Sequence, residues 1–391
     1  MKPRIMFFCD YYLPGFKAGG GMWAVKNIIE RFHDVYDFFL VTKNHNGRDD
    51  KTPYTSVNTD SWNDLGDVKA FYLAPSKITS RKVGDLVNEI NPDTVFLNSV
   101  FSTPVVKFLI ARKRGLILDI PVVLATCGEL SAATLKMKRA KKSAFLTAAK
   151  AFGLYDNLIW RASSEDEKTE IESIFGLKKE IYLAPDLTPK TILPDYKSAY
   201  KPLKESGSAK FIFVSRIARK KNLLFFLELL RKYPDGKIEF EIVGPTEDDA
   251  YWEQCQDAIS KLSENVQISI SGSLNNTDVL ERLINSHFFV LPTLNENFGY
   301  VCIEAFAAGC PSLLSDKTIW NGLERCKIGW NLALSDEQGW INCINAAVSM
   351  DSTEFETMSS NARSFAVDWV ATPSIEQATA DLLNGAVARS K

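Results

Sequence analysis

Two glutamates eight residues apart, Glu296 and Glu304, are the strongest chemical signal in the sequence, and they lie where a short apolar run gives way to a helical pattern. Carboxylates only accept hydrogen bonds, so they suit the hydroxyl groups of sugars. Eight helical residues rise about 12 Å, close to the span between the ribose and the distal sugar of a nucleotide diphosphate sugar. The spacing therefore predicts that Glu304 holds a ribose and Glu296 contacts the second sugar.

The residues between the two glutamates add hydrogen-bond donors. Free backbone N–H groups around Asn297, Phe298 and Gly299 would suit a phosphate or a sugar oxygen. In the alternative interpretation, the first acid only complements the helix dipole and Glu304 lies on a solvated face. Glu304 is flanked by Val-Cys-Ile and Ala-Phe-Ala-Ala-Gly, and this apolar setting favours the functional interpretation.

A cationic loop, Ser-Arg-Ile-Ala-Arg-Lys-Lys-Asn at 215–222, separates a predicted strand from a predicted helix. Cations near a helix N-terminus oppose the helix dipole unless an anion is also present. A diphosphate would satisfy Arg216, Lys221 and the helix end together. The alternative is an ordinary solvated basic turn.

Three consecutive glycines, Gly19, Gly20 and Gly21, precede the first helical pattern. Glycine permits close approach of the backbone to a phosphate or sugar, so these residues are candidates for donor binding. A plain flexible turn explains them equally well.

Short apolar runs, which predict strands, alternate along the chain with helical patterns. These strands and helices must position the loops. The pattern is typical of α/β proteins with parallel sheets, in which ligands bind beyond the carboxyl ends of the strands. We predict two doubly wound Rossmann-like domains that face each other across a cleft. The predicted parts are residues 1–185 (acceptor domain), 186–205 (linker), 206–370 (nucleotide-sugar domain) and 371–391 (a helix that packs back on the first domain).

Composition narrows the class of protein. The chain has 391 residues, 46% of them hydrophobic and 24% charged, which is ordinary for a globular protein. The net charge of −2 gives no global field for nucleic acid, so we expect no nucleic-acid partner. The seven cysteines form no C-x-x-C pair and predict free thiols in a reducing compartment. Since no signal peptide or apolar membrane span is evident, we expect a cytoplasmic protein, with peripheral contact to the inner face of the cytoplasmic membrane as a further possibility.

These motifs together resemble family 4 retaining glycosyltransferases, which have the two-domain GT-B fold. The resemblance rests on Glu296 and Glu304, on the Arg216 and Lys221 pair, and on the Ala-Gly-Cys-Pro turn at 308–311. It implies a metal-independent hexosyl transfer in which the donor is held by the second domain. No cofactor or protein-bound metal is expected.

The resemblance also implies further donor contacts, at Gly244, Gly272 and Leu274. The N-terminal half resembles a subgroup that builds bacterial surface polysaccharides. Its matching segments are Asp-Tyr-Tyr-Leu-Pro-Gly at 10–15, Leu-Asn-Ser at 97–99, Gly-Glu-Leu at 128–130 and Gly-Leu-Tyr at 153–155. That subgroup usually has an Arg before the Gly-Glu pair, where this chain has Cys127.

On the acceptor side we single out Glu129, Asn98 and His45. Glu129 follows a predicted strand and is a candidate to bind or activate an acceptor hydroxyl, although it is equally well explained as an acid at a helix N-terminus. His45 lies in a polar loop, where a solvated histidine is the alternative. The predicted catalytic residues are Glu296, Glu129, Arg216 and Lys221.

A basic segment with interleaved apolar residues covers 135–150. Read as one helix, it predicts contact with an anionic membrane surface; an ordinary solvated helix face is the alternative. The predicted contacts are Lys136, Lys138, Arg139, Lys141 and Lys142.

The sequence thus predicts a retaining glycosyltransferase of bacterial polysaccharide or O-antigen assembly. It would move a sugar from a nucleotide diphosphate sugar to an oligosaccharide or lipid-linked acceptor. The alternatives are a nucleotide-sugar epimerase or another enzyme on the same fold, such as a phosphorylase, and a non-catalytic nucleotide-sugar-binding subunit.

Overall fold

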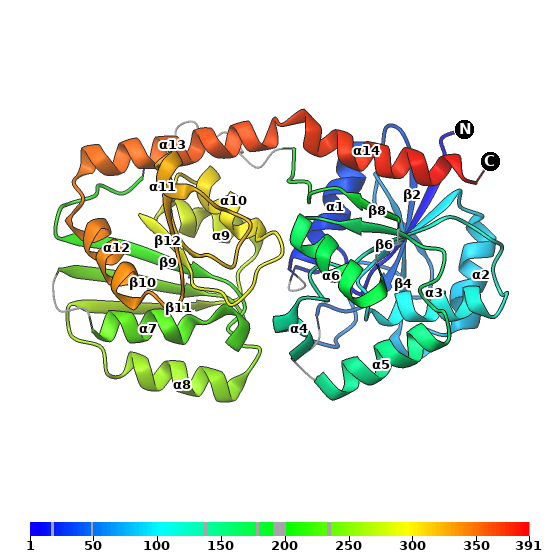
Figure 1. The fold of residues 1–391 in the computed structure, drawn as a ribbon, viewed down its shortest axis with the longest axis horizontal. Helices are drawn as coiled ribbons and strands as arrows, with labels where there is room; N and C mark the ends of the chain where they lie inside the picture. Colours follow the sequence, from blue (N-terminus) through cyan, green and yellow to red (C-terminus); the bar gives the residue numbers. More distant parts are fainter. Residues whose placement is uncertain are drawn as a thin grey trace. The chain divides into compact units, whose positions relative to one another are not determined.

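A computed structural model describes residues 1–16, 19–47, 50–136, 139–176, 180–190, 201–232 and 236–390. Lys138, Lys391 and residues 191–200 of the predicted linker lie outside these described residues. The chain divides into two compact units (Figure 1). Unit 1 comprises Met1–Lys190 and Thr372–Lys391, and unit 2 comprises Thr191–Ala371.

Unit 1 is built on an eight-stranded sheet in the order β3-β4-β2-β1-β5-β6-β7-β8. All neighbouring strands are parallel except β3 and β4. The central strands are buried on both faces, which explains their continuous apolar runs. The strands are β1 (Arg4–Phe8), β2 (Asp37–Lys43), β3 (Trp62–Asp64), β4 (Lys69–Leu73), β5 (Thr94–Asn98), β6 (Val122–Ala125), β7 (Ile159–Ala162) and β8 (Glu180–Leu183).

The helices of unit 1 belong to two buried clusters, one for each face of the sheet. They are α1 (Gly20–Phe32), α2 (Ser80–Ile90), α3 (Thr103–Lys113), α4 (Ala132–Lys136), α5 (Arg139–Ala151), α6 (Glu165–Phe175) and α14 (Pro373–Ala388), with a short 3-10 turn at Pro75–Lys77. Helix α14 contributes Leu382 and Leu383 to the same cluster as α1. The C-terminal helix is therefore part of the core of unit 1.

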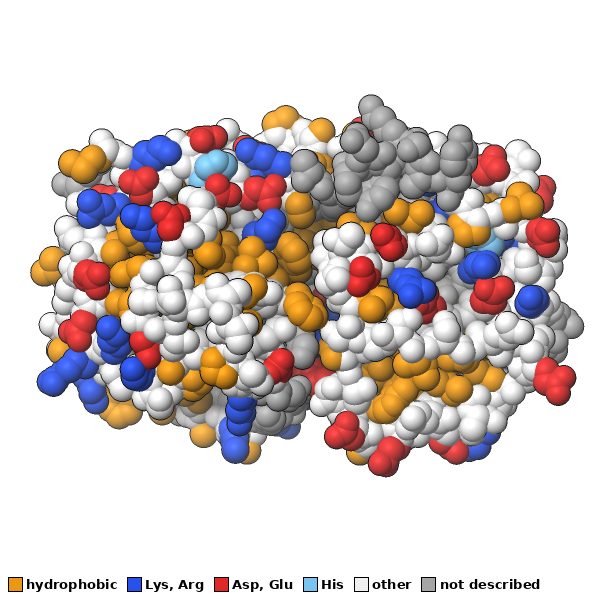
Figure 2. Space-filling model, turned by 180° about the vertical axis from the view of Figure 1, so that it is seen from behind, with side chains coloured by type: hydrophobic (Ala, Val, Ile, Leu, Met, Phe, Trp, Pro, Cys, Tyr) orange, Lys and Arg blue, Asp and Glu red, His pale blue; other side chains and the backbone are white. Residues whose placement is uncertain are grey.

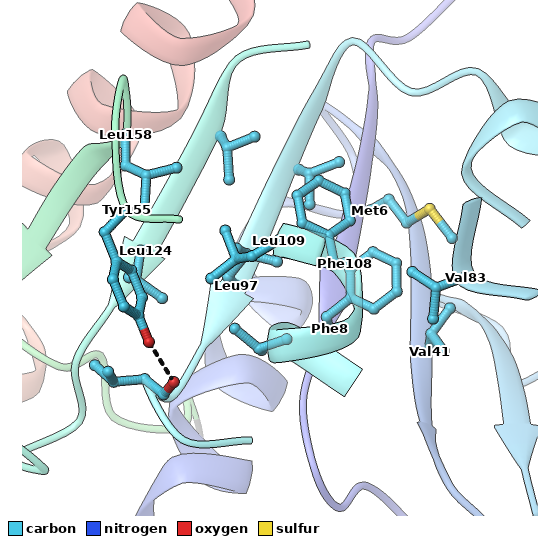
Figure 3. Packing of buried hydrophobic residues seen from close by; sticks show 14 of the residues in the cluster. Met6, Phe8, Val41, Val83, Leu97, Phe108, Leu109, Leu124, Tyr155 and Leu158 are labelled. Atoms are coloured by element: carbon cyan, nitrogen blue, oxygen red, sulfur yellow. Dashed lines mark hydrogen bonds between the residues drawn. The ribbon is translucent and has the colours of Figure 1, made fainter. Parts of the chain in front are cut away.

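The core on the other face of the sheet supports the loop after β5. Figure 3 shows Phe8 and Phe108 packed together, with Tyr155 at the edge of the cluster. The buried Tyr155 hydroxyl donates to the Val100 carbonyl at 3.0 Å. Apolar packing thereby fixes a segment that lies at the carboxyl end of the sheet.

Unit 2 contains a six-stranded parallel sheet in the order β11-β10-β9-β12-β13-β14. Its strands are β9 (Ser208–Val214), β10 (Lys237–Val243), β11 (Val266–Gly272), β12 (Phe288–Leu291), β13 (Ser312–Ser315) and β14 (Gly329–Leu332). Its helices are α7 (Leu223–Arg231), α8 (Asp249–Ile259), α9 (Asn276–Ile284), α10 (Tyr300–Ala307), α11 (Leu323–Cys326), α12 (Glu337–Ser349) and α13 (Ser352–Val370), with a 3-10 turn η3 (Arg219–Lys221).

In both sheets the chain order reverses beside the first strand. Strand β1 has β2 on one side and β5 on the other, and β9 has β10 and β12. Such a topological switch point is where doubly wound sheets bind ligands, beyond the carboxyl ends of the strands. The predicted α/β class with two doubly wound domains is confirmed.

The surface reflects the near-neutral composition. Figure 2 shows basic and acidic side chains scattered over the viewed face, with hydrophobic side chains gathered between them. All seven cysteines are free, and Cys9, Cys255, Cys302 and Cys310 are buried. Among helices built from described residues, none has the length and apolar character needed to cross a membrane.

Candidate active site

The switch point of unit 2 brings the cationic loop and the first glutamate together. Strands β9 and β12 are adjacent and parallel, so the loops that follow them leave the same edge of the sheet. The Leu294 N–H donates to the Lys220 carbonyl at 2.8 Å, and the buried Thr293 hydroxyl donates to the same oxygen at 3.1 Å. These bonds fix the two loops against each other.

Lys221 and Glu296 form an ion pair within this edge. Only 11% of the Lys221 side chain and 14% of the Glu296 side chain are exposed. Burial acts to raise the pKa of Glu296, but the charge and hydrogen bond of Lys221 outweigh it, aided by Lys220 and Arg216, and the pKa is lowered. Glu296 is therefore held as an anion beside a cation.

The loop that carries Glu296, between β12 and α10, is hydrogen-bonded to the segment at the end of β13 and after it. The Glu296 N–H donates to the Lys317 carbonyl at 2.9 Å, and the buried Ser315 hydroxyl donates to the Thr293 carbonyl at 2.6 Å. The indole of Trp320 donates to the Phe298 carbonyl at 2.6 Å. These contacts join residues distant in sequence, and no local motif signals them.

Gly299 is needed for the geometry of this loop. Its φ of +74° is in the left-handed region, and a Cβ there would lie 2.9 Å from Cγ of Glu296. The residue precedes α10, so glycine allows the chain to turn closely past Glu296 into the helix. Phe298 and Trp320 are buried, and their rings pack 5.2 Å apart. Trp320 therefore packs against this loop.

Glu304 lies one turn into α10. Burial raises the pKa of its carboxyl to about 7. Within the described part of the chain, nothing donates a hydrogen bond to it or pairs with it. Glu296 lies in the loop before α10, which begins at Tyr300, so the rise of about 12 Å for eight helical residues does not describe the separation of the two glutamates.

Arg216 and Gly244 lie at the ends of the neighbouring strands β9 and β10. Gly244 has a φ of +142°, and a Cβ there would lie 1.9 Å from the Ser215 carbonyl oxygen, so only glycine fits. Its N–H donates to the Gly272 carbonyl at 2.7 Å, which joins the end of β11 to the same edge. Leu274 follows in that loop and is half-buried. The predicted donor residues of unit 2 therefore share one edge of its sheet.

The triple glycine lies in unit 1. Gly19 has a φ of +71° and directly precedes α1, whose first residues are Gly20 and Gly21. The Asn98 amide donates to the Gly21 carbonyl at 3.0 Å, and the Cys127 thiol donates to the Asn98 side-chain oxygen at 3.1 Å. Asn98 therefore links the ends of β5 and β6 to the start of α1.

Glu129 is held by neutral donors. One of its oxygens accepts from the Ser99 hydroxyl at 2.7 Å and from the N–H groups of Val100 and Phe101 at 2.8 and 3.1 Å. Burial raises its pKa, although these hydrogen bonds act in the opposite direction. Glu129 thus organises the turn before α3, and it lies at the same sheet edge as Asn98.

Asp10, from the matching segment at 10–15, extends this network together with Ser102 and Lys43, which the sequence did not indicate. The Ser102 N–H donates to the Ser99 hydroxyl at 3.1 Å, and its own hydroxyl donates to Asp10 at 2.9 Å. Asp10 also pairs with Lys43 at 2.8 Å. A chain of polar contacts therefore crosses the switch point of unit 1, from β2 to the loop after β6.

His45 differs from the prediction of a solvated loop residue. It is 5% exposed, and its Nδ1 lies 2.9 Å from the Gly47 carbonyl oxygen and 3.0 Å from the Asp50 carbonyl oxygen. Its ring packs edge-on against Tyr11 at 5.5 Å. The two carbonyl oxygens and the Tyr11 ring surround the imidazole, so the side chain is enclosed rather than solvated.

The basic segment is not one continuous described helix. It comprises α4 and α5, with Lys138 outside the described residues. Lys142 donates to the Thr134 carbonyl at 2.8 Å and lies over the Phe101 ring. Lys136, Arg139 and Lys141 are exposed. Only part of the predicted basic face is therefore directed to solvent.

A metal centre finds no support in the part of the chain that the structure describes. No group of three or more His, Cys, Asp or Glu side chains there could hold an ion.

Comparison with known families gives a match on the segment that carries the unit 2 site. Residues 197–322 match the family model described as Glycosyl transferases group 1. This segment includes Arg216, Lys221, Glu296 and Glu304. A search of curated proteins gives no match.

Solved structures match along nearly the whole chain. Sucrose-phosphate synthase from Thermosynechococcus elongatus is 15% identical with a TM-score of 0.73, and the match covers 99% of this chain and 100% of that one. Anabaena HepE in complex with UDP and glucose is 16% identical, with a TM-score of 0.70 and coverage of 98% and 100%. WaaG, a glycosyltransferase involved in lipopolysaccharide biosynthesis, is 14% identical, with a TM-score of 0.67 and coverage of 97% and 100%. These matches show that the chain has the GT-B fold.

Proposed function

We propose that this chain is a retaining, metal-independent glycosyltransferase that uses a nucleotide diphosphate sugar. The observation that carries the proposal is the buried Lys221–Glu296 pair at the switch point of unit 2. It lies within the segment that matches the glycosyltransferase family model. The match to a HepE structure that contains UDP and glucose supports a nucleotide-sugar donor.

Each charged group has a role in this proposal. Arg216 and Lys221 bind the diphosphate and stabilise the negative charge that develops on it as it leaves. The backbone around Asn297, Phe298 and Gly299, with Gly244, Gly272 and Leu274, surrounds the remaining donor atoms. Glu296 accepts from hydroxyls of the transferred sugar.

Glu304 is the proposed ribose contact. The Glu304 carboxyl is partly buried and has no described donor, so two ribose hydroxyls would supply the hydrogen bonds that its partial desolvation removes. The donor would therefore complete the hydrogen bonding of a group that the folded protein leaves unsatisfied among its described residues.

The proposed reaction proceeds on one face of the donor sugar. The acceptor oxygen forms a bond to the anomeric carbon while the bond from that carbon to the diphosphate oxygen breaks. The acceptor hydroxyl proton passes to the leaving phosphate oxygen. Because the new bond forms on the face from which the diphosphate leaves, the sugar keeps its configuration. In unit 1, Gly19, Gly20 and Gly21 would approach the donor, and Glu129 and Asn98 would bind the acceptor. His45 would act by shaping its loop, because it is buried and its Nδ1 already contacts two carbonyl oxygens of that loop.

We further propose an acceptor that belongs to bacterial polysaccharide assembly and is lipid-linked. The N-terminal motifs and the match to WaaG support this assignment. The exposed cations Lys136, Arg139 and Lys141 would contact an anionic membrane surface, each contributing about 1 kcal/mol. A cytoplasmic location at the inner face of the membrane follows from this proposal.

Ligand-induced thermal stabilisation tests the donor assignment. UDP, GDP and ADP, their monophosphates and their glucose conjugates are added to the wild type and to Glu304→Gln. A donor nucleotide raises the melting temperature because it binds only the folded state. We expect one base to stabilise the wild type clearly and Glu304→Gln less. If no nucleotide shifts the wild type, the proposal is wrong.

Product analysis separates the transferase from its rivals. The stabilising nucleotide sugar is incubated with and without membrane extract as acceptor. Label transferred to extract, together with release of nucleoside diphosphate, supports the transferase. Epimerised donor formed without acceptor would instead identify an epimerase, and a bound but unchanged donor would identify a binding subunit.

Vesicle sedimentation tests the membrane contact. We expect the wild type to sediment with vesicles that contain anionic lipid and to remain free with neutral ones. Replacing Lys136, Arg139 and Lys141 by Gln should abolish sedimentation. A control variant carries the same change at the exposed Lys232, Lys237 and Lys261 of unit 2. Equal sedimentation of the two variants would contradict the contact.

A further inference from the structure

The loop after β10 is fixed against the cationic loop by backbone hydrogen bonds. The Ile217 N–H donates to the Pro245 carbonyl at 2.8 Å, and the Glu247 N–H donates to the Ile217 carbonyl at 3.1 Å. Ile217 and Thr246 also form an isolated parallel bridge. The backbone of Glu247 is therefore held at a set distance from that of Arg216.

Glu247 holds the Arg216 guanidinium at one of its ends. Arg216 Nη1 donates to Glu247 Oε2 at 2.5 Å. No other residue in the described part of the chain bonds to Arg216, so its Nε and Nη2 groups make no hydrogen bond there. Those two N–H groups form a fork that can bind two oxygens of one phosphate. The contact therefore leaves the phosphate-binding edge of Arg216 open.

Arg219, in the same loop, provides a comparison because its guanidinium is held by other residues of the fold. Its Nε donates to Asp248 at 3.0 Å, and its guanidinium lies over the Tyr251 ring at 5.3 Å. Asp248 in turn caps α8 through the Tyr251 N–H at 2.9 Å. Nε on the fork edge of Arg219 thus bonds within the fold, whereas neither N–H group on that edge of Arg216 does.

We propose that Glu247 is a positioning residue that holds Arg216 by one end and presents its free edge to the donor diphosphate. This inference rests on the proposed function. Arg216 is long and 45% exposed, so without the contact its side chain would sample several rotamers. Ordering it beforehand lowers the entropy cost of binding. A carboxylate that merely competed with the diphosphate would be expected to occupy the fork edge instead.

The test compares two variants by calorimetric titration with UDP, GDP and ADP and with the matching monophosphates. Glu247→Ala should weaken binding of the preferred diphosphate about fivefold to tenfold, the loss expected for one hydrogen bond of ordinary strength. Binding of the monophosphate should change less than twofold, because Arg216 acts on the second phosphate. Glu247→Gln should retain wild-type affinity within threefold, since its amide oxygen still accepts from Nη1.

Two further variants complete the test. In an Arg216→Ala background, Glu247→Ala should have no additional effect on diphosphate affinity. Glu239→Ala is the matched control, because Glu239 lies on β10 and pairs with Lys210 at 3.1 Å. It should leave affinity unchanged.

The titration results distinguish failure of this inference from failure of the proposed function. Tighter binding by both Glu247 variants would overturn the inference and identify Glu247 as a competitor of the diphosphate. Unchanged binding by Glu247→Ala, or equal losses for the Ala and Gln variants, would also overturn it. If the wild type binds no nucleotide, the proposed function fails instead, which is a distinct result.

Discussion

Glu129 and Glu296 occupy comparable places in the two units but have opposite environments. Each lies beyond a strand end, near the start of a helix. Glu129 accepts from a hydroxyl and two backbone N–H groups, and burial raises its pKa. Burial acts on Glu296 as well, but Lys221 lowers its pKa. Neutral hydrogen-bond donors thus fix the position of a carboxylate, whereas a neighbouring cation also keeps it ionised.

The two environments suit different tasks. An ionised Glu296 next to Lys221 provides fixed charges for binding a polar, charged donor. A Glu129 with a raised pKa can exchange a proton nearer to neutrality. The following experiments test this contrast, in order of decreasing expected effect.

The largest effect is expected from Lys221→Ala. It should lower kcat about 100- to 1000-fold by removing a cation at the leaving group. It should also lower the free energy of unfolding by about 3–5 kcal/mol, because Glu296 would remain buried without its partner. Turnover of the donor and urea denaturation measure the two losses.

Two further variants check this result. Lys317→Ala removes a nearby exposed cation that pairs with Asp316 at 3.0 Å, and it should leave both quantities nearly unchanged. The double variant Lys221→Met with Glu296→Gln should regain stability without activity. Full activity of Lys221→Ala would show that the pair has no catalytic role.

A smaller effect is expected from Gly299→Ala. The new Cβ would displace Glu296, so we expect kcat to fall about tenfold to a hundredfold, in line with the cost of misplacing a reacting group. Gly207→Ala is the control, since Gly207 of unit 2 also has a positive φ, +88°, but open space around it. That control should lose only about 1 kcal/mol of stability to backbone strain. Equal activity of the two variants would exclude displacement of Glu296 as the cause.

The third effect is a pH dependence from Glu304. Its pKa is about 7 in the folded protein and has an ordinary value of 4.5. Between these values the folded state holds one more proton than the unfolded state, so the free energy of unfolding falls as pH rises. Glu304→Gln should therefore stabilise the protein more at pH 8 than at pH 5. Melting temperatures across this range measure the difference, and the exposed Glu281→Gln should show none.

The smallest effect is expected from Glu129→Gln. The amide oxygen can still accept from Ser99 and the two N–H groups, so stability should change by less than about 1 kcal/mol. We expect a change of a few fold in the KM for acceptor and none for donor. Initial rates at varied acceptor concentration measure this split. A larger change in the KM for donor would contradict an acceptor-side position.

Local pattern was sufficient for several features of the fold. The α/β class followed from alternating apolar runs and helical patterns, and the predominantly parallel sheets of both units agree with it. The antiparallel edge strand β3 was not predicted, because its three residues resemble a loop, and strand β4, which lies between β2 and β3, was not predicted either. The segment 135–150 was read as one helix, whereas the structure describes α4 and α5.

The sequence by itself determined which side chains stand after which strands. A switch point places such loops together, so Arg216, Lys221 and Glu296 could be proposed as one site from spacing and residue type. Tertiary structure alone decided that Lys221 pairs with Glu296, 75 residues away, that Glu247 holds one end of Arg216, and that His45 is enclosed. The reason is physical: these contacts depend on the register of adjacent strands and on burial, and neither is encoded in any one local segment.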